Sequence, residues 1–174
     1  MDAPDRNQVL QLLAEAREAL VASTAGLSDE QAKIRPAPDR WSVLDCVEHV
    51  AFVEDALFTR ISTQMVPAAP DPDRTREELI LRVAGARERR FNAPEQAQPK
   101  GRFADLASAL QHFKQSRARS IAYFEQCDLD LRAHSLLHPV VGPTNGQEFA
   151  LILALHPARH AAQIREVRSA LGFA

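Results

Sequence analysis

Hydrophobic residues recur at intervals of three or four positions along most of this chain, the spacing that places them on one face of an α-helix. Alternation of apolar and polar residues, which would predict β-strands, is almost absent, and the periodic stretches are rich in strong helix formers. The pattern therefore indicates an all-α protein. It predicts helices over residues 6–23, 42–65, 75–92, 103–126 and 144–171.

Capping residues and prolines mark where these helices begin and end. In a capping box, the side chains of a polar N-cap residue and of the residue three positions later bond each other's backbone N–H groups. Four pairs have this spacing: Ser28 with Gln31, Ser42 with Asp45, Thr75 with Glu78, and Thr144 with Gln147. Residues 128–143 are expected to be irregular. Because the chain has no internal repeat and no interior linker, we expect one helical-bundle domain over residues 1–174.

Composition narrows the class of protein further. The 174 residues are 45% hydrophobic and carry 21 basic and 23 acidic side chains, which gives a formal net charge of −2. A chain of this length can bury a core without disulfides, and its charge gives no sign of a nucleic-acid partner. The longest strongly apolar stretch, residues 149–158, is about half of the roughly 20 residues that a membrane span requires.

The cysteines and the N-terminus bear on location. Cys46 and Cys127 are far apart, so they do not suggest a disulfide framework, and Cys46 is best interpreted as an inert core thiol. The first residues include Asp2 and Asp5, unlike the positively charged start of a signal peptide. We therefore expect a cytoplasmic protein with no membrane partner.

The last predicted helix places two histidines on its apolar face. His156 and His160 fall in the middle of the apolar sector, and Gln163 lies beside them. Two imidazoles one turn apart in a core are costly unless each nitrogen has a partner. A shared metal ion is one solution, because side chains at positions i and i+4 converge. Hydrogen bonds to backbone carbonyls are the alternative.

Other histidines add a third candidate ligand. His49 lies at the border of the apolar stripe of helix 42–65, where it could reach the bundle interior or stay half-exposed. His138, in the segment before the last helix, could lie near the buried face of that helix. His112 and His134 are interpreted as surface or loop residues.

Two charged residues interrupt apolar stripes. Glu54 stands in the stripe of helix 42–65, and Arg117 stands in the stripe of helix 103–126. The two could form a buried ion pair between helices. Alternatively, Arg117 could anchor a substrate carboxylate.

Two segments resemble motifs of a known family. Residues 41–50, WSVLDCVEHV, are similar to the W-S-x-x-[DE]-x-x-x-H-[LV] opening of the second helix in the DinB-like superfamily. Residues 156–164, HPARHAAQI, resemble its C-terminal H-x-x-[RK]-H-x-x-Q-I motif, and the likeness extends over residues 27–171. The resemblance implies a four-helix bundle with an additional short helix. It also implies one divalent metal ion held by His49, His156 and His160.

The resemblance implies a range of activities as well. Members of this superfamily are described as metal-dependent hydrolases, and some as S-transferases or isomerases that use small cellular thiols. Zinc, nickel and manganese are associated with their sites, and homodimers are common. We therefore expect a small-molecule substrate, with a cellular thiol as one candidate, and a homodimer.

Pro157 departs from the pattern of a regular helix interior. It lies between the two C-terminal histidines, removes a hydrogen bond to the carbonyl of Leu153 and disfavours helical angles at His156. We expect a kink at this position, which could still leave both imidazoles convergent.

Three neutral imidazoles leave at least one coordination position open, which is typical of a catalytic metal site. Such an ion could lower the pKa of a bound water toward about 7 for attack on an ester or amide, or bind a substrate thiolate for transfer. The sequence leaves both reactions open. No carboxylate stands where an H-E-x-x-H motif would place a general base, so hydrolysis lacks an obvious proton acceptor. Gln163, which could orient a bound water, and Arg117 are the candidate catalytic residues. The alternative to an enzyme is a non-catalytic metal-binding or structural bundle.

Overall fold

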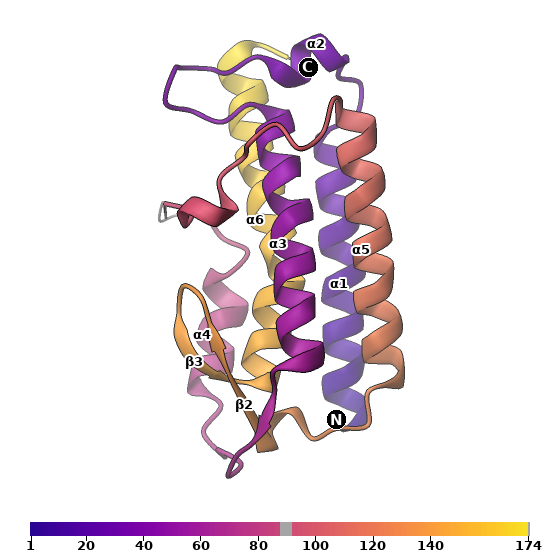
Figure 1. Cartoon of the computed structure of the whole chain (residues 1–174), viewed down its shortest axis with the longest axis vertical. Helices are drawn as coiled ribbons and strands as arrows, with labels where there is room; N and C mark the ends of the chain where they lie inside the picture. The colour runs from indigo at the N-terminus through magenta and orange to yellow at the C-terminus, as the bar shows by residue number, and fades with distance from the viewer. Residues whose placement is uncertain (88–91, 174) are drawn as a thin grey trace.

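Four long helices lie side by side in the computed structural model, which describes residues 1–87 and 92–173 (Figure 1). They are α1 (Ala3–Ser23), α3 (Val43–Thr63), α5 (Leu106–Gln126) and α6 (Gly146–Leu171). In the view of Figure 1, α1 and α6 run upward and α3 and α5 run downward. Each packs against two neighbours, because α1 and α3 both contact α5 and α6. The expected four-helix bundle is confirmed.

Shorter elements lie at the ends and on one side of the bundle. The short helix α4 packs against α6, and the strands form a small antiparallel sheet in the order β1-β2-β3, with Leu136 opposite Thr144. These elements are α2 (Asp29–Lys33), β1 (Val66–Pro67), α4 (Thr75–Val83), the 3-10 turns η1 (Glu95–Ala97) and η2 (Leu131–Ala133), β2 (His134–His138) and β3 (Gly142–Asn145).

Two of the expected capping boxes are confirmed. The hydroxyls of Ser28 and Ser42 each accept a hydrogen bond from the N–H three residues later, and the side chain there reaches back to the cap. The box expected at Thr75 is wrong, because Arg74 is the N-cap of α4 and the Thr75 N–H donates to Asp73 instead. Helix α4 ends at Val83 rather than near residue 92, and residues 88–91 of the predicted stretch lie outside the described residues.

The box expected at Thr144 is also wrong, by one residue. Asn145 caps α6 and its side chain accepts a hydrogen bond from the N–H of Glu148. Thr144 belongs to β3, and its hydroxyl donates to the carbonyl of Leu136 on the neighbouring strand. The Thr144 side chain therefore bonds the neighbouring strand instead of capping α6.

The prediction that residues 128–143 are irregular is wrong as well. They contain η2, β2 and the first residues of β3. The hairpin carries no long alternating pattern, and Gly142 and Pro143 are typical of turns rather than strands. Helix α5 begins at Leu106 instead of Phe103, because Asp105 caps it by accepting from the N–H of Ser108.

Two apolar clusters fill the interior of the bundle. Leu13, Leu57, Phe124 and Leu153 belong to the first, and Leu20, Val47, Phe113 and Ile164 belong to the second. Along α3 the buried Glu54 stands between residues of the two clusters, and along α5 the buried Arg117 does the same. Among the described residues, no helix has both the length and the apolar character to cross a membrane.

Candidate metal centre

Three histidines from two helices bring their ring nitrogens together inside the bundle. His49 lies on α3, and His156 and His160 lie one turn apart on α6. The Nε2 atom of His156 is 3.3 Å from that of His49 and 3.1 Å from that of His160. One ligand atom from each residue lies within 4.8 Å of the other two. Across residues 1–87 and 92–173, no other group of histidine, cysteine or carboxylate side chains gathers in this way.

The three histidines differ in how much of their surface is exposed. His49 and His160 are only 5% and 6% exposed, whereas His156 is half-buried. The indole of Trp41 lies 4.9 Å from the ring of His49 and stacks on the ring of His160 at 6.3 Å, measured between centroids. Trp41 directly precedes Ser42, so the capped start of α3 fixes its place. His156 is therefore the most exposed of the three residues.

A backbone carbonyl fixes the tautomer of His49. Its Nδ1 lies 2.7 Å from the carbonyl oxygen of Ala97, in η1. Because a carbonyl only accepts, Nδ1 must carry the proton, and Nε2 presents a lone pair to the cluster. Among the described residues, the carbonyl-bonded alternative for these histidines is seen at Nδ1 of His49, whereas the Nε2 atoms of His156 and His160 face each other.

The loop that carries Ala97 is held by the residue before His49. The carboxylate of Glu48, 1% exposed, accepts hydrogen bonds from the backbone N–H groups of Lys100 and Arg102 at 2.5 and 2.9 Å. It also accepts from the guanidinium of Arg102 at 2.7 Å. Adjacent residues of α3 therefore supply a ring to the cluster and anchor the loop that orients that ring.

The three Nε2 atoms fit a divalent ion better than they fit protons. At most one N–H can lie between each pair of nitrogens, and His49 brings none, so lone pairs remain without donors. Two nitrogens bound at about 2.0–2.1 Å in a tetrahedral arrangement lie about 3.3–3.4 Å apart. The observed 3.1 and 3.3 Å match this spacing closely.

The electrostatics keep all three rings neutral. Burial lowers the pKa of His49, while the hydrogen bond to Ala97 opposes this shift. The pKa values of His156 and His160 lie well below the usual range, first because of burial and then because the other imidazoles are so close. Neutral imidazole is the form that binds metal ions.

Pro157 does not separate the two ligands of α6. The helix runs from Gly146 to Leu171 with Pro157 inside it, and the rings of His156 and His160 converge with centroids 4.6 Å apart. The expected convergence across the proline is therefore present.

Glu54 and Arg117 form the buried ion pair that was one of the two interpretations. Arg117 Nη2 lies 2.8 Å from Glu54 Oε2, and the side chains are 0% and 1% exposed. Ser120 Oγ donates to the other carboxylate oxygen at 2.7 Å. Burial raises the pKa of Glu54 and lowers that of Arg117, and each shift is opposed by the charge of the partner. A catalytic role for Arg117 stays a prediction.

Three other residues singled out in the sequence are buried: Gln163, His138 and Cys46. Gln163 is buried one turn after His160, and its catalytic role also stays a prediction. His138 is buried near the start of α6, where its ring packs edge-on against Phe149 and burial lowers its pKa to about 4. Cys46 is fully buried and burial raises its pKa, as expected for an inert thiol.

His112 and His134 take no part in the cluster. The first hydrogen-bonds the carboxylate of Asp55 at 2.6 Å, and the second hydrogen-bonds the carbonyl of Asp130 at 2.7 Å. Sequence reasoning did not identify Ala97, Glu48 or the packing of Trp41 on the rings. The position of Glu48 beside His49 is the only local sign, because the loop contacts depend on residues about fifty positions away.

Known proteins with similar sequence or structure support this fold. The chain is 25% identical over 157 residues to the uncharacterized protein YuaE of Bacillus subtilis (strain 168), covering 88% of this chain and 93% of the relative. Its structure is similar to that of YfiT from Bacillus subtilis, described as "a probable metal-dependent hydrolase with an unusual four-helix bundle topology". That match has a TM-score of 0.66 and 17% identity, and covers 100% of this chain and 91% of YfiT.

Two further solved structures show the same architecture. TT2238, described as a four-helix bundle protein, matches with a TM-score of 0.61 and 19% identity over 92% of this chain and 98% of its own. A conserved protein from Enterococcus faecalis matches with a TM-score of 0.64 and 16% identity over 99% of both chains. The family model of the DinB superfamily matches residues 12–164, which is most of the sequence. The chain belongs to the DinB superfamily.

Proposed function

We propose that this protein is an enzyme that holds one divalent metal ion through His49, His156 and His160. The observation that carries the proposal is the convergence of three Nε2 atoms, at 3.1 and 3.3 Å from neighbour to neighbour, in a largely buried cluster of neutral imidazoles. A structural zinc site normally has four protein ligands, whereas three ligands with an accessible side are typical of a catalytic site.

The ligand set bears on which metal is bound. Imidazole nitrogens suit zinc and nickel, whereas manganese prefers carboxylate and carbonyl oxygens. No carboxylate belongs to the cluster within the described part of the chain. We therefore propose zinc or nickel ahead of manganese. Such an ion would supply Lewis-acid chemistry, which makes a bound water or thiol easier to deprotonate.

Two buried carboxylates of α3 near His49 in the sequence are already engaged. Glu48 holds Arg102 and the loop amides, and Glu54 holds Arg117 and Ser120. Neither is free to take a proton from water. A thiol, with an ordinary pKa of about 8.5 against about 15.7 for water, makes a much smaller demand on a base. We therefore propose transfer of a small thiol as the first candidate reaction.

Hydrolysis is the second candidate. It is favoured by the likeness to YfiT, itself described as a probable metal-dependent hydrolase. In either reaction we expect the substrate to approach at His156, the most exposed of the three residues, with Gln163 on the next turn of α6 to orient it.

Metal analysis tests the site. Protein purified without chelator or nickel resin should contain one divalent ion per chain. His160→Ala should abolish binding and His49→Ala should weaken it strongly. His134→Ala, which removes a half-buried histidine outside the cluster, is the matched control and should bind normally. Affinity should fall only at a pH below the ordinary imidazole value of about 6.5, because burial lowers the pKa of all three rings. Unchanged metal content in the His160 variant would refute the assignment.

Spectroscopy and kinetics then separate the two reactions. A small thiol added to the cobalt-substituted protein should give a sulfur-to-cobalt charge-transfer band if thiol transfer is correct. Ester cleavage that rises through one ionisation near neutral pH, and disappears in His160→Ala, would favour hydrolysis instead. If the fully metallated protein gives neither signal, it is a non-catalytic metal-binding bundle.

A further inference from the structure

Pro157 leaves a backbone carbonyl without its usual helical partner. In a regular helix the N–H of residue 157 would donate to the carbonyl of Leu153, but proline has no N–H. Leu153 is fully buried in the bundle, so water cannot readily take the place of that donor. A buried carbonyl without a donor is costly, and the cost falls on the helical turn that carries His156.

Arg117 supplies the donor that Pro157 removes. Its Nη2 lies 3.2 Å from the carbonyl oxygen of Leu153, and its Nη1 lies 3.4 Å from that of Ala154. The guanidinium thus crosses from α5 to the carbonyls of α6 just before His156. It is fully buried, so these contacts are made away from solvent.

The guanidinium is itself held in place from two sides. Glu54 on α3 accepts from Nη2 at 2.8 Å, and Ser120 on α5 fixes the carboxylate with a hydrogen bond of 2.7 Å. The ring of Phe113 lies under the guanidinium, 5.5 Å from Cζ to centroid. Ser120, Glu54 and Arg117 form a chain of hydrogen bonds that ends on the backbone of α6.

We propose that Arg117 is a positioning residue of the metal centre. By bonding the carbonyl of Leu153, which Pro157 leaves without a helical donor, and the neighbouring carbonyl of Ala154, it sets the path of α6 between His156 and His160 and so the spacing of two of the three ligands. This inference rests on the proposed function, because it takes the cluster to be a metal site. Residues that orient metal ligands commonly change affinity by about 10–100-fold when they are removed.

A purely structural ion pair would behave differently. It would stabilise the fold whether residue 157 is proline or not, since the bond between Glu54 and Arg117 does not involve that residue. A positioning role makes the contact of Arg117 with α6 important for metal binding only while Pro157 is present. Pro157→Ala restores a helical N–H for the carbonyl of Leu153 and should make the guanidinium dispensable there.

A double-mutant cycle measures this dependence. The pair Glu54→Leu with Arg117→Met removes both charges together, so that no unpaired charge remains to unfold the bundle. It is made in the natural chain and in the chain with Pro157→Ala. Arg117→Lys is the second variant, because an ammonium keeps a charge for Glu54 but lacks the planar fork that also reaches the carbonyls. Arg119→Met, which removes an exposed ion pair on the same helix, is the control.

Affinity for Zn²⁺ and Co²⁺ and the urea midpoint of the metal-free protein are the readouts. With Pro157 present, the Glu54–Arg117 replacement and Arg117→Lys should each weaken metal binding by about tenfold or more. With Pro157→Ala the same changes should weaken it by about twofold or less, and the loss of urea midpoint should shrink in parallel. Arg119→Met should leave both readouts unchanged.

The remaining outcomes overturn either the positioning role of Arg117 or the proposed metal site, and the two failures can be told apart. Equal losses of affinity in both backgrounds would show that the pair supports the fold as a whole, and no loss in either would show that the carbonyl contacts do not position the ligands. If the natural chain binds neither ion, the proposed function fails and the positioning role fails with it. The urea cycle of the metal-free protein still decides, in that case, whether Arg117 replaces the hydrogen bond lost at Pro157.

Discussion

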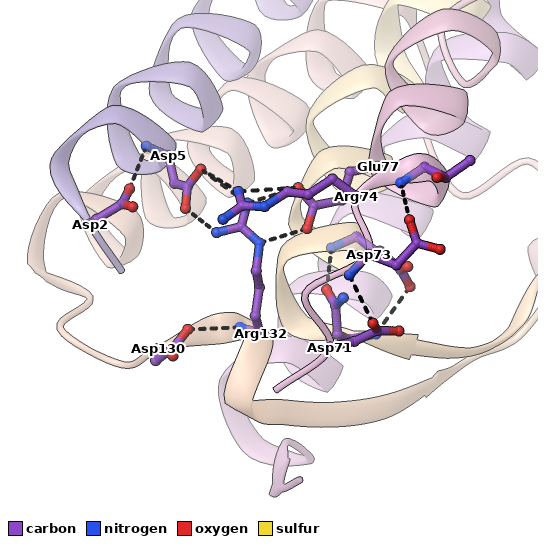
Figure 2. A network of polar contacts seen from close by, with 11 residues as sticks. Asp2, Asp5, Asp71, Asp73, Arg74, Glu77, Asp130 and Arg132 are labelled. Carbon is purple, nitrogen blue, oxygen red and sulfur yellow. Dashed lines mark hydrogen bonds and ion pairs between the residues drawn. The ribbon is translucent and has the colours of Figure 1, made fainter. Parts of the chain in front are cut away.

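Two arginines bind carboxylates at very different depths in this molecule. Arg117 lies in the middle of the bundle, where its ion pair with Glu54 is 0–1% exposed. Arg132, in η2 at the lower end of the bundle, lies between Asp5 of α1 and Glu77 of α4, and these side chains are 9–14% exposed (Figure 2). Both arginines connect elements that are distant in the sequence.

At the end of the bundle, hydrogen bonds with charged partners determine the direction of the pKa shifts. Arg132 donates to both oxygens of Glu77 at 2.7 Å and to both oxygens of Asp5. These bonds raise the pKa of Arg132, and its guanidinium holds the pKa of Asp5 below the ordinary value. Arg74 also approaches the two carboxylates, at 3.7 and 4.0 Å. The fold therefore favours the charged forms of Arg132 and Asp5.

Inside the bundle, burial determines the direction of the pKa shifts. Desolvation raises the pKa of Glu54 and lowers that of Arg117, even though the two groups are in direct contact. A buried pair of this kind contributes little net stability compared with apolar side chains of similar volume. The comparison indicates that the outer network ties α1, α4 and η2 together at one end of the bundle, whereas the inner pair adds little net stability over apolar residues.

The largest effect is expected from removing one inner charge. Arg117→Met leaves Glu54 buried without a counter-charge, so the free energy of unfolding at pH 7 should fall by about 3–5 kcal/mol. Urea denaturation followed by circular dichroism measures it. Replacing Glu54 with leucine and Arg117 with methionine together should cost less than Arg117→Met alone. A single variant that loses less than about 1 kcal/mol would contradict the account of the inner pair.

The sequence suggested the ion pair between Glu54 and Arg117, but it did not suggest the contact of Arg117 with α6. Glu54 and Arg117 each interrupt an apolar stripe, and opposite charges at buried positions of two helices must neutralise each other. The contact of Arg117 with the carbonyl of Leu153 could not be predicted, because it depends on the rotation and height of α5 relative to α6. Those quantities are set by packing of the whole bundle.

Elsewhere in the molecule, too, features with a local sequence pattern could be predicted, whereas contacts set by packing of the whole fold could not. The long helices follow from a 3.6-residue period sustained over about twenty residues, and His156 and His160 converge because they lie one turn apart. The β2–β3 hairpin is short and rich in turn formers, so it has no comparable signal. The bond from His49 to Ala97 requires a loop whose course is fixed by Glu48, and no local pattern encodes that.

A smaller effect is expected at the end of the bundle. Arg132→Met should lower the free energy of unfolding by about 2 kcal/mol, because hydrogen bonds to charged groups contribute about 1.5–3 kcal/mol and the carboxylates left behind can still be partly hydrated. Arg6→Met is the matched control at the same end, since Arg6 pairs with the 95% exposed Asp128. It should cost less than about 1 kcal/mol. A loss from Arg132→Met as large as that from Arg117→Met would remove the distinction between the two regions.

The smallest expected effect is the pH dependence of the stability lost in Arg132→Met and in Arg117→Met. The pKa of Asp5 is lowered from its ordinary value of 3.8, so its contribution is complete above 3.8 and is lost as the pH falls through the lower pKa of the folded state. The difference in unfolding free energy between the natural chain and Arg132→Met should therefore stay constant from pH 7 to about 4.5 and shrink below 3.8. Denaturation curves collected from pH 7 to 2.5 provide the measurement.

Glu54 reverses the sign of this dependence. Its pKa is raised above the ordinary 4.5 in the folded protein, and it should rise further when Arg117 is absent, because the charge of Arg117 opposes the effect of burial. Folding then favours the protonated carboxyl, so the loss caused by Arg117→Met is largest at high pH and shrinks as the pH falls toward 4.5. The Arg117 difference should thus begin to close at a higher pH than the Arg132 difference. If both close over the same range, the carboxylates experience similar environments, and burial does not distinguish the inner pair from the outer network.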